Sequence, residues 1–337
     1  MHDIWSQLRQ WVIEKRSFAL ATVVEASKPS PRGIGAVLAI CEGGQDFIGS
    51  VSAGCVENEV IDLAQSCIRD AKTRWIKFGP DQGMPWEVSL SCGGKISVRI
   101  DPFTYDKSIT PKLCEALDNH VFGLWITQND RQFLLNADGE LTGDASLWSP
   151  QALDLAKEHL KAKSETQQIE TPDGTPLFRS LEKPKRLFIV GAVHIAIHLV
   201  AIARTLNYQT IVIDPREHYT NSDRFATKPE QLITAWPSQA LIDFTLSSTD
   251  CTIAITHDRK IDDDALSVFL KSGSAYIGAL GSNKSHQARL NRLSELGFSE
   301  QSISKIHGPI GLDIGSKTPA EIAISIMAEI VQKTNAR

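Results

Sequence analysis

Short apolar runs alternate with amphipathic segments along the second half of the chain. The runs predict strands, and the segments between them, such as residues 195–206 and 285–296, predict helices. Buried strands that alternate with helices are typical of a parallel, doubly wound sheet. We therefore predict a Rossmann-like α/β domain over residues 186–337. Its strands are expected at residues 187–190, 210–214, 231–235, 251–256 and 275–279.

The last helix of this domain has a clear start signal. Thr318 is placed to cap the helix, Pro319 follows at the first helical position, and Glu321 completes a capping box. Apolar residues then recur every four positions, so one face of the helix should pack on the sheet. That face consists of Ile322, Ile326 and Ile330.

The first half of the chain has a less regular pattern. It predicts one long helix over residues 56–71 and several short strands, which indicates an α+β domain over residues 1–181. Pro184, between charged residues, marks a linker before the Rossmann-like domain. The strands are expected at residues 18–25, 35–41, 47–52, 96–100, 123–127 and 132–135.

Composition narrows the class of protein. A chain of 337 residues with 42% hydrophobic and 22% charged residues can form two ordinary globular domains. Its net charge of −5 argues against nucleic acid as a partner, and the absence of long apolar runs argues against a membrane span. The charged N-terminal helix does not resemble a signal peptide. The six cysteines form no CxxC pair, so we expect free thiols in a cytoplasmic protein.

A nucleotide-binding motif is expected where the first Rossmann strand meets its helix. Gly191 can form the tight turn, and Asp214 stands where an acidic residue would bind ribose hydroxyls. The second glycine of the usual motif is replaced by Val193, whose branched side chain should obstruct a pyrophosphate. This obstruction argues against NAD(P) binding, and the alternative is a Rossmann-like domain without a dinucleotide.

Further polar and small residues follow other strands of this sheet. His194 follows the first strand and His257 the fourth, and these ends are neighbours if the strand order is 3-2-1-4-5. Gly278 and Gly281 surround the end of the fifth strand, where backbone amides could meet a ligand. The alternative is that each histidine has a structural role and binds no ligand.

Three loops of the first domain are rich in small residues. Glycine and serine before a helix can bind an anion through backbone amides, and an arginine can add a bidentate phosphate contact. The alternative is that these glycines simply form hairpin turns. The candidate binding residues are Arg32, Gly33 and Gly35 in the first loop, Ser52, Gly54 and Cys55 in the second, and Cys92, Gly93 and Gly94 in the third.

Cys55 and Cys92 each stand beside glycine, where the chain can approach a ligand. Cys55 is also expected at a helix start, where the helix dipole favours a thiolate. The alternative for both is a small buried packing residue. Packing is the role that we predict for Cys67, Cys114 and Cys251.

These motifs together resemble the XdhC/CoxI family, accessory proteins of molybdenum hydroxylases such as xanthine dehydrogenase. Val193 and Ala53 stand where members of the family usually carry glycine. The matching motifs are residues 21–24, 30–32, 49–52, 54–57 and 92–94 in the first domain, and residues 214–216, 224–225, 256–258, 276–282, 309–314 and 318–323 in the second.

The resemblance implies a maturation factor rather than xanthine dehydrogenase itself. Such a protein binds the molybdenum cofactor, in mononucleotide or dinucleotide form, assists its sulfuration and inserts it into an apo molybdenum hydroxylase. A cysteine desulfurase and a second copy of the chain are the other implied partners. Cys55 and Cys92 would then meet the molybdenum or its incoming sulfur. The competing hypotheses are an NAD(P)-linked oxidoreductase and a scaffold that only bridges the hydroxylase and the desulfurase.

Overall fold

The computed structural model describes residues 2–27, 30, 32–79, 93–129, 131–143, 145–182 and 184–335. The chain divides into two compact units, Met1–Lys183 and Pro184–Arg337. Cys92, one of the candidate site residues, lies outside the described residues.

The second unit is built on a six-stranded parallel sheet in the order β13-β12-β11-β14-β15-β16. This order confirms the predicted Rossmann-like fold, and it contains the arrangement 3-2-1-4-5, the condition under which the strand ends before His194 and His257 are neighbours. The sequence pattern missed the sixth strand, which is only two residues long. The strands are β11 (Arg186–Val190), β12 (Gln209–Ile213), β13 (Gln231–Ile233), β14 (Cys251–Ala254), β15 (Tyr276–Ala279) and β16 (Ile306–His307).

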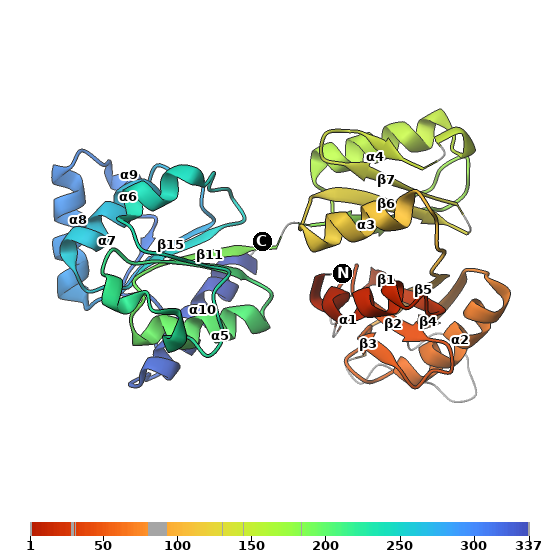
Figure 1. Cartoon of the computed structure of the whole chain (residues 1–337), viewed down its shortest axis with the longest axis horizontal. Helices are drawn as coiled ribbons and strands as arrows, with labels where there is room; N and C mark the ends of the chain where they lie inside the picture. The colour runs from red at the N-terminus through yellow and green to blue at the C-terminus, as the bar shows by residue number, and fades with distance from the viewer. Residues whose placement is uncertain are drawn as a thin grey trace. The chain divides into compact units, whose positions relative to one another are not determined.

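Helices cover both faces of this sheet. In Figure 1, α5 (His194–Thr205) and α10 (Pro319–Asn335) lie on one face, and the remaining α-helices of this unit lie on the other. That second group consists of α6 (Pro237–Ala240), α7 (Arg259–Phe269), α8 (Asn283–Glu295) and α9 (Glu300–Ile303). Short 3₁₀ turns occupy Glu217–Tyr219, Ser222–Arg224 and Leu241–Asp243.

The start of α10 confirms the predicted capping box. The backbone N–H of Glu321 donates to the Thr318 hydroxyl at 3.3 Å, and the backbone N–H of Thr318 donates to the Glu321 carboxylate at 2.8 Å. Ile326 and Ile330 are fully buried against the sheet and α5, and Ile322 is partly buried beside them. The predicted apolar face therefore holds this helix on the sheet.

The first unit contains two antiparallel sheets, where the sequence indicated only a set of short strands. The first sheet has the order β3-β2-β1-β5-β4, and the second has the order β8-β7-β6-β10-β9. The first consists of β1 (Phe18–Ala26), β2 (Val37–Cys41), β3 (Phe47–Gly49), β4 (Arg74–Phe78) and β5 (Ile96–Pro102). The second consists of β6 (Gly123–Gln128), β7 (Arg131–Asn136), β8 (Leu141–Thr142), β9 (Gln167–Gln168) and β10 (Leu177–Leu181).

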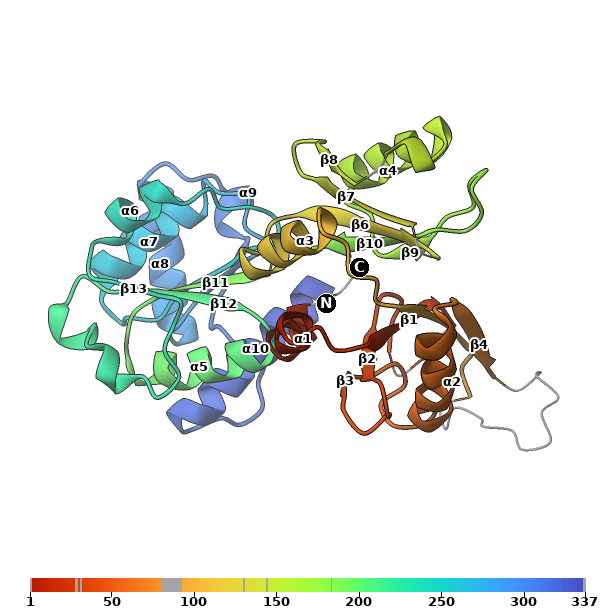
Figure 2. The same cartoon turned by 45° about the vertical axis from the view of Figure 1, so that its right-hand side comes forward.

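Helices and sheets form alternating layers in this unit (Figure 2). α2 (Glu57–Asp70) packs on one face of the first sheet, and α4 (Pro150–Ala162) packs on one face of the second. α1 (His2–Ile13) and α3 (Ile109–Asp118) share a core with the facing sides of both sheets. Because both faces of β1 are covered, its residues are apolar in both alternating sets. A 3₁₀ turn at Ala145–Leu147 precedes α4.

Buried charges connect the two sheets. Arg99 on β5 donates through its Nε to both oxygens of Asp101, at 2.9 and 3.1 Å, and reaches the Thr127 carbonyl on β6. Arg179 on β10 lies 3.5 Å from the Asp101 carboxylate and donates to the Thr22 hydroxyl on β1 at 2.9 Å. Both arginines are 1% exposed, so two buried guanidinium groups share one carboxylate.

Burial has the largest effect on the pKa of the Arg179 guanidinium. It lowers the pKa of this guanidinium to about 10, while the neighbouring Asp101 carboxylate opposes the shift. The group therefore stays protonated at neutral pH. The first unit thus keeps a positive charge between its sheets, and Asp101 is the carboxylate that compensates it.

Candidate functional site

The three small-residue loops of the first unit emerge at the same end of its first sheet. β1, β3 and β4 run in one direction, and β2 and β5 run against them. The ends of β1, β3 and β4 and the starts of β2 and β5 therefore meet at one edge. Hydrogen bonds tie this edge together, because the Ser27 N–H donates to the Lys95 carbonyl at 2.9 Å and the Lys95 N–H donates to the Ser27 hydroxyl at 2.7 Å. The sequence alone did not reveal this convergence.

A cavity of about 370 Å³ opens at this edge. It is large enough for part of a small molecule, since ligand pockets measure roughly 300–1,000 Å³. Two lysines, Lys77 and Lys95, contribute positive charge, while Glu25 accepts a hydrogen bond from Ser97 at 2.6 Å. The described lining contains none of the residues predicted from the sequence. It consists of Glu25, Ala26, Ser27, Lys77, Phe78, Gly79, Lys95, Ile96 and Ser97.

The loop between β1 and β2 is held as a turn. Gly35 has a φ of +85°, a left-handed conformation that favours glycine, and its N–H donates to the Val23 carbonyl at 2.8 Å. The carbonyl of Gly33 accepts from Ala36 at 3.2 Å. Arg32 is partly buried, and its carbonyl accepts from the Ser30 hydroxyl. These hydrogen bonds of Gly33 and Gly35 shape the turn, and Arg32 is the charged residue among the candidates in this loop.

In the loop that leads into α2, a carboxylate of the protein itself occupies the predicted anion position. Glu57, the first residue of α2, accepts from the hydroxyls of Ser50 and Ser52 at 2.6 and 2.5 Å. It also accepts from the N–H groups of Ser52 and Gly54 at 3.0 and 2.9 Å. Burial tends to raise the pKa of Glu57, but the hydrogen bonds from Ser50 and Ser52 outweigh burial and lower it to about 2.

The cysteines of the described residues differ in surroundings. Cys55 is half-buried just before α2, packs against the core beneath that helix, and donates its N–H to the Ser52 hydroxyl at 2.9 Å. Cys67 and Cys251 are fully buried, and burial raises the pKa of each thiol to about 12. Cys114 is partly buried in the core between the sheets. The packing role predicted for these last three cysteines is confirmed.

The turn after β11 has the predicted glycine geometry. Gly191 has a φ of +116°, and a Cβ there would lie 3.0 Å from the Thr256 backbone nitrogen. Asp214 is fully buried, and its carboxylate accepts from the Ala192 N–H at 2.9 Å and from three N–H groups of Arg216 at 2.7–3.0 Å. Ribose binding by Asp214 would have to break these bonds.

Val193 immediately precedes α5 at its cap position. It is half-buried, packs against the core of that face, and makes no side-chain capping bond. Because its side chain stands where a pyrophosphate would approach the helix, Val193→Gly is expected to raise NAD affinity, with Val193→Ala raising it less. Calorimetric titration with NAD measures this change. Unaltered affinity in both variants would mean that Val193 is not what limits binding.

The two candidate histidines follow neighbouring strands of this sheet, β11 and β14. Both side chains are exposed. His194 packs on His198 at a ring-centroid distance of 5.2 Å, and His257 has a left-handed φ of +63°. The strand order therefore places both at the edge where ligands bind in this fold.

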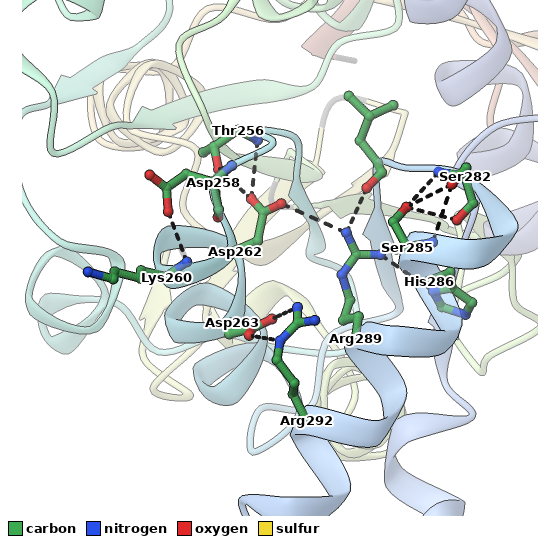
Figure 3. Close-up of polar contacts among 11 residues, drawn as sticks. Thr256, Asp258, Lys260, Asp262, Asp263, Ser282, Ser285, His286, Arg289 and Arg292 are labelled. Atoms are coloured by element: carbon green, nitrogen blue, oxygen red, sulfur yellow. Dashed lines mark hydrogen bonds and ion pairs between the residues drawn. The ribbon is translucent and has the colours of Figure 1, made fainter.

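A buried polar cluster that sequence reasoning missed lies at the ends of β14 and β15 (Figure 3). Asp262 on α7 accepts from the Thr256 hydroxyl at 2.7 Å and lies 3.8 Å from Arg289 on α8. Arg289 donates to the Leu280 carbonyl at 2.6 Å. Burial raises the pKa of Asp262 and lowers that of Arg289, so burial opposes the charged form of both groups. A signal for this cluster was present in the sequence, because Asp262 in α7 and Arg289 in α8 are charged residues on the buried faces of their helices.

The candidate glycines beside this cluster make room for protein atoms. A Cβ at Gly278 would collide with Ile310 and Tyr276, and a Cβ at Gly281 would collide with Ser285. Ser285 and Ser282 form the capping box that starts α8. Packing therefore accounts for both glycines. Gly93 has a φ of +70° and Gly94 is buried. Both directly precede Lys95, which lines the cavity.

Metal-binding clusters and membrane spans are both missing from the described part of the chain. No group of three or more His, Cys, Asp or Glu side chains among the described residues is arranged to hold a metal ion. Of the helices that these residues form, none has the length and apolarity needed to cross a bilayer.

Comparison with known families decides the classification. Residues 11–79 match the model of the XdhC and CoxI family, and residues 187–330 match the model of the XdhC Rossmann domain. The chain belongs to the XdhC and CoxI family. The two matches together take in more than half of the chain, and the resemblance inferred from its motifs is confirmed.

Relatives of this XdhC-type chain extend over its whole length. It is 27% identical over 339 residues to a probable xanthine dehydrogenase subunit of Bacillus subtilis, and the match covers 98% of each chain. It is 23% identical over 312 residues to the molybdenum cofactor insertion chaperone PaoD of Escherichia coli, and this match covers 92% of the chain and 81% of PaoD. A crystal structure described as a xanthine dehydrogenase from Bacillus halodurans matches 98% of this chain and 96% of its own, with a TM-score of 0.78 at 22% identity. This structural match shows that the fold is shared.

Proposed function

We propose that this chain binds the molybdenum cofactor as cargo, assists its sulfuration, and inserts it into an apo molybdenum hydroxylase of the xanthine dehydrogenase type. The relative PaoD is named a molybdenum cofactor insertion chaperone, and this name supports the molybdenum cofactor as the cargo. The observation that carries the proposal is the convergence of the family's loops beside a lysine-bearing cavity of about 370 Å³. We place this maturation factor in the cytoplasm, as a homodimer that also meets a cysteine desulfurase.

The residues at this edge suit the parts of such a cargo. A pterin with a phosphate or dinucleotide tail is anionic, and Lys77, Lys95 and Arg32 supply positive charge on the segments that meet there. Thiolates are soft ligands that suit molybdenum or carry sulfur, which is the role proposed for Cys55 and Cys92. The turns at Gly33, Gly35, Gly93 and Gly94 let the backbone approach a ligand.

The second unit supports the alternative function, an NAD(P)-linked oxidoreductase, less well than the first unit supports cofactor binding. The Asp214 carboxylate is occupied by Ala192 and Arg216, and Val193 stands at the start of α5. We propose instead that the second unit contributes to cargo binding through the edge formed by Gly191, His194 and His257.

Serine variants of the two cysteines test the proposed chemistry. Cys55→Ser and Cys92→Ser are expected to fold normally, because the exchange is small, but to leave a co-expressed hydroxylase at the activity of a host without this chain. At least one of the two thiols should react with iodoacetamide at neutral pH and be protected by bound cofactor.

The matched control is Cys114→Ser, which changes a partly buried packing cysteine. It should leave activation intact. Full activation by both the Cys55 and the Cys92 variants would remove thiol chemistry from the mechanism. Cargo binding would then rest on Arg32, on the lysines of the cavity, and on the turns at residues 33–35 and 93–94.

A further inference from the structure

We propose that Glu57 is the permanent internal anion of the loop at residues 50–56, and that it positions Cys55 instead of leaving the loop open to a phosphate. Each oxygen of its carboxylate accepts three hydrogen bonds. One oxygen accepts from the Ser50 hydroxyl and the N–H groups of Val51 and Ser52. The other accepts from the Ser52 hydroxyl and the N–H groups of Gly54 and Val56.

This arrangement uses up the anion-binding capacity of the loop. A carboxylate offers about four lone-pair positions, so six donors saturate it. The remaining two N–H groups of the loop are taken by the same serines, because Ala53 donates to the Ser50 hydroxyl at 2.7 Å and Cys55 donates to the Ser52 hydroxyl at 2.9 Å. Every backbone N–H from residue 51 to residue 56 thus bonds Glu57 directly or through one hydroxyl. A phosphate could enter only by displacing Glu57.

The loop needs such an anchor because its backbone is strained. Ala53 has a φ of +61° and Gly54 a φ of +107°, so two consecutive residues are left-handed. Alanine adopts this conformation only where its surroundings hold it there. The converging bonds to Glu57 supply that constraint and fix the chain direction at Cys55, the next residue.

The charge of Glu57 also changes the electrostatics at the start of α2. The positive end of a helix attracts anions, and Glu57 places a carboxylate in its first turn. The cargo's phosphate is therefore directed away from this loop, toward the lysines of the cavity. The importance of Cys55 rests on the proposed function, whereas the anchoring by Glu57 does not.

Alkylation of Cys55 by iodoacetamide, followed by peptide mass spectrometry, tests the inference with inorganic phosphate as the anion probe. Wild-type protein should alkylate at the same rate in phosphate and in chloride of equal ionic strength. Glu57→Ala removes all six hydrogen bonds to the carboxylate, and losing even one hydrogen bond to a charged group shifts a local opening equilibrium by about tenfold, so Cys55 in this variant should alkylate at least about tenfold faster. Phosphate should slow this variant back toward the wild-type rate by filling the vacated donors.

Two further variants separate anchoring from a general loss of structure. Glu59→Gln removes a neighbouring charge from the first turn of the same helix and should behave as wild type. Glu57→Gln keeps the size of the side chain, but its amide NH₂ would point at N–H and O–H groups that are themselves donors. In the absence of phosphate, Cys55 in this variant should therefore also alkylate faster than in wild type.

Either of two results would overturn the inference. One is protection of wild-type Cys55 by phosphate, a measurement that needs no variant. The other is an alkylation rate in both Glu57 variants within about twofold of the Glu59→Gln rate, a span that a single hydrogen bond to a charged group exceeds. Neither readout uses the hydroxylase or the cofactor, so this inference and the proposed function can fail separately.

Discussion

Replacing Asp101 with asparagine is expected to lower the free energy of unfolding of the first unit by about 3–5 kcal/mol. Asp101 is the carboxylate between Arg99 and Arg179, and both guanidinium groups are 1% exposed. Without it, two buried positive charges face each other among hydroxyl groups, carbonyl groups and the rings of Trp75 and Trp125, none of which carries a compensating negative charge. Urea unfolding followed by tryptophan fluorescence reports on this unit, because all tryptophans except Trp236 precede residue 184.

Two variants serve as controls for this prediction. Arg179→Met removes one of the two cations and leaves the Arg99–Asp101 pair, so it should cost clearly less than Asp101→Asn. Asp138→Asn changes an exposed carboxylate and should stay within about 0.5 kcal/mol of wild type. A loss below about 1 kcal/mol for Asp101→Asn would show that the two arginines do not depend on this carboxylate.

Asp214→Ala is expected to destabilise the second unit by about 3 kcal/mol. Its carboxylate is fully buried and holds both the Ala192 N–H at the turn after β11 and the Arg216 side chain. Removing it leaves the turn N–H and part of the guanidinium without acceptors. Differential scanning calorimetry of the whole chain should show a lower unfolding temperature for the transition of this unit.

Asp223→Ala is the matched control, because its carboxylate is 90% exposed and lies 3.5 Å from Lys228. Exposed ion pairs contribute little, so stability should change by less than about 1 kcal/mol. If Asp214→Ala is as stable as wild type but loses a measurable affinity for NADH, the ribose-binding hypothesis for Asp214 would be restored.

The Rossmann-like unit was predictable because its information is local. Strands buried on both faces appear as continuous apolar runs, as in β11 and β14, and capping residues mark the start of α10. β16 escaped prediction because two residues carry no periodicity. β4 escaped because an apolar residue, Trp75, lies on its exposed face, so apolar and polar residues do not alternate along this edge strand.

The sites depend on contacts that no local pattern contains. Arg99 and Arg179 are far apart in sequence, so their shared carboxylate could not be inferred. Glu57 stood within a recognised motif, yet its role became visible only once the loop folded back over it. Serines and glycines before a helix predict an anion position, but they do not say whether a ligand or the chain itself fills it.

Pterin analysis of the purified protein tests the central claim most directly. The chain is expressed in a host that synthesises molybdopterin, purified, and oxidised in acid, and the fluorescent pterin is measured per mole of chain. If the protein carries the molybdenum cofactor, pterin and chain should be present in comparable molar amounts. Absence of pterin, together with enhanced NADH fluorescence on mixing with the protein, would contradict the cargo proposal and favour an oxidoreductase.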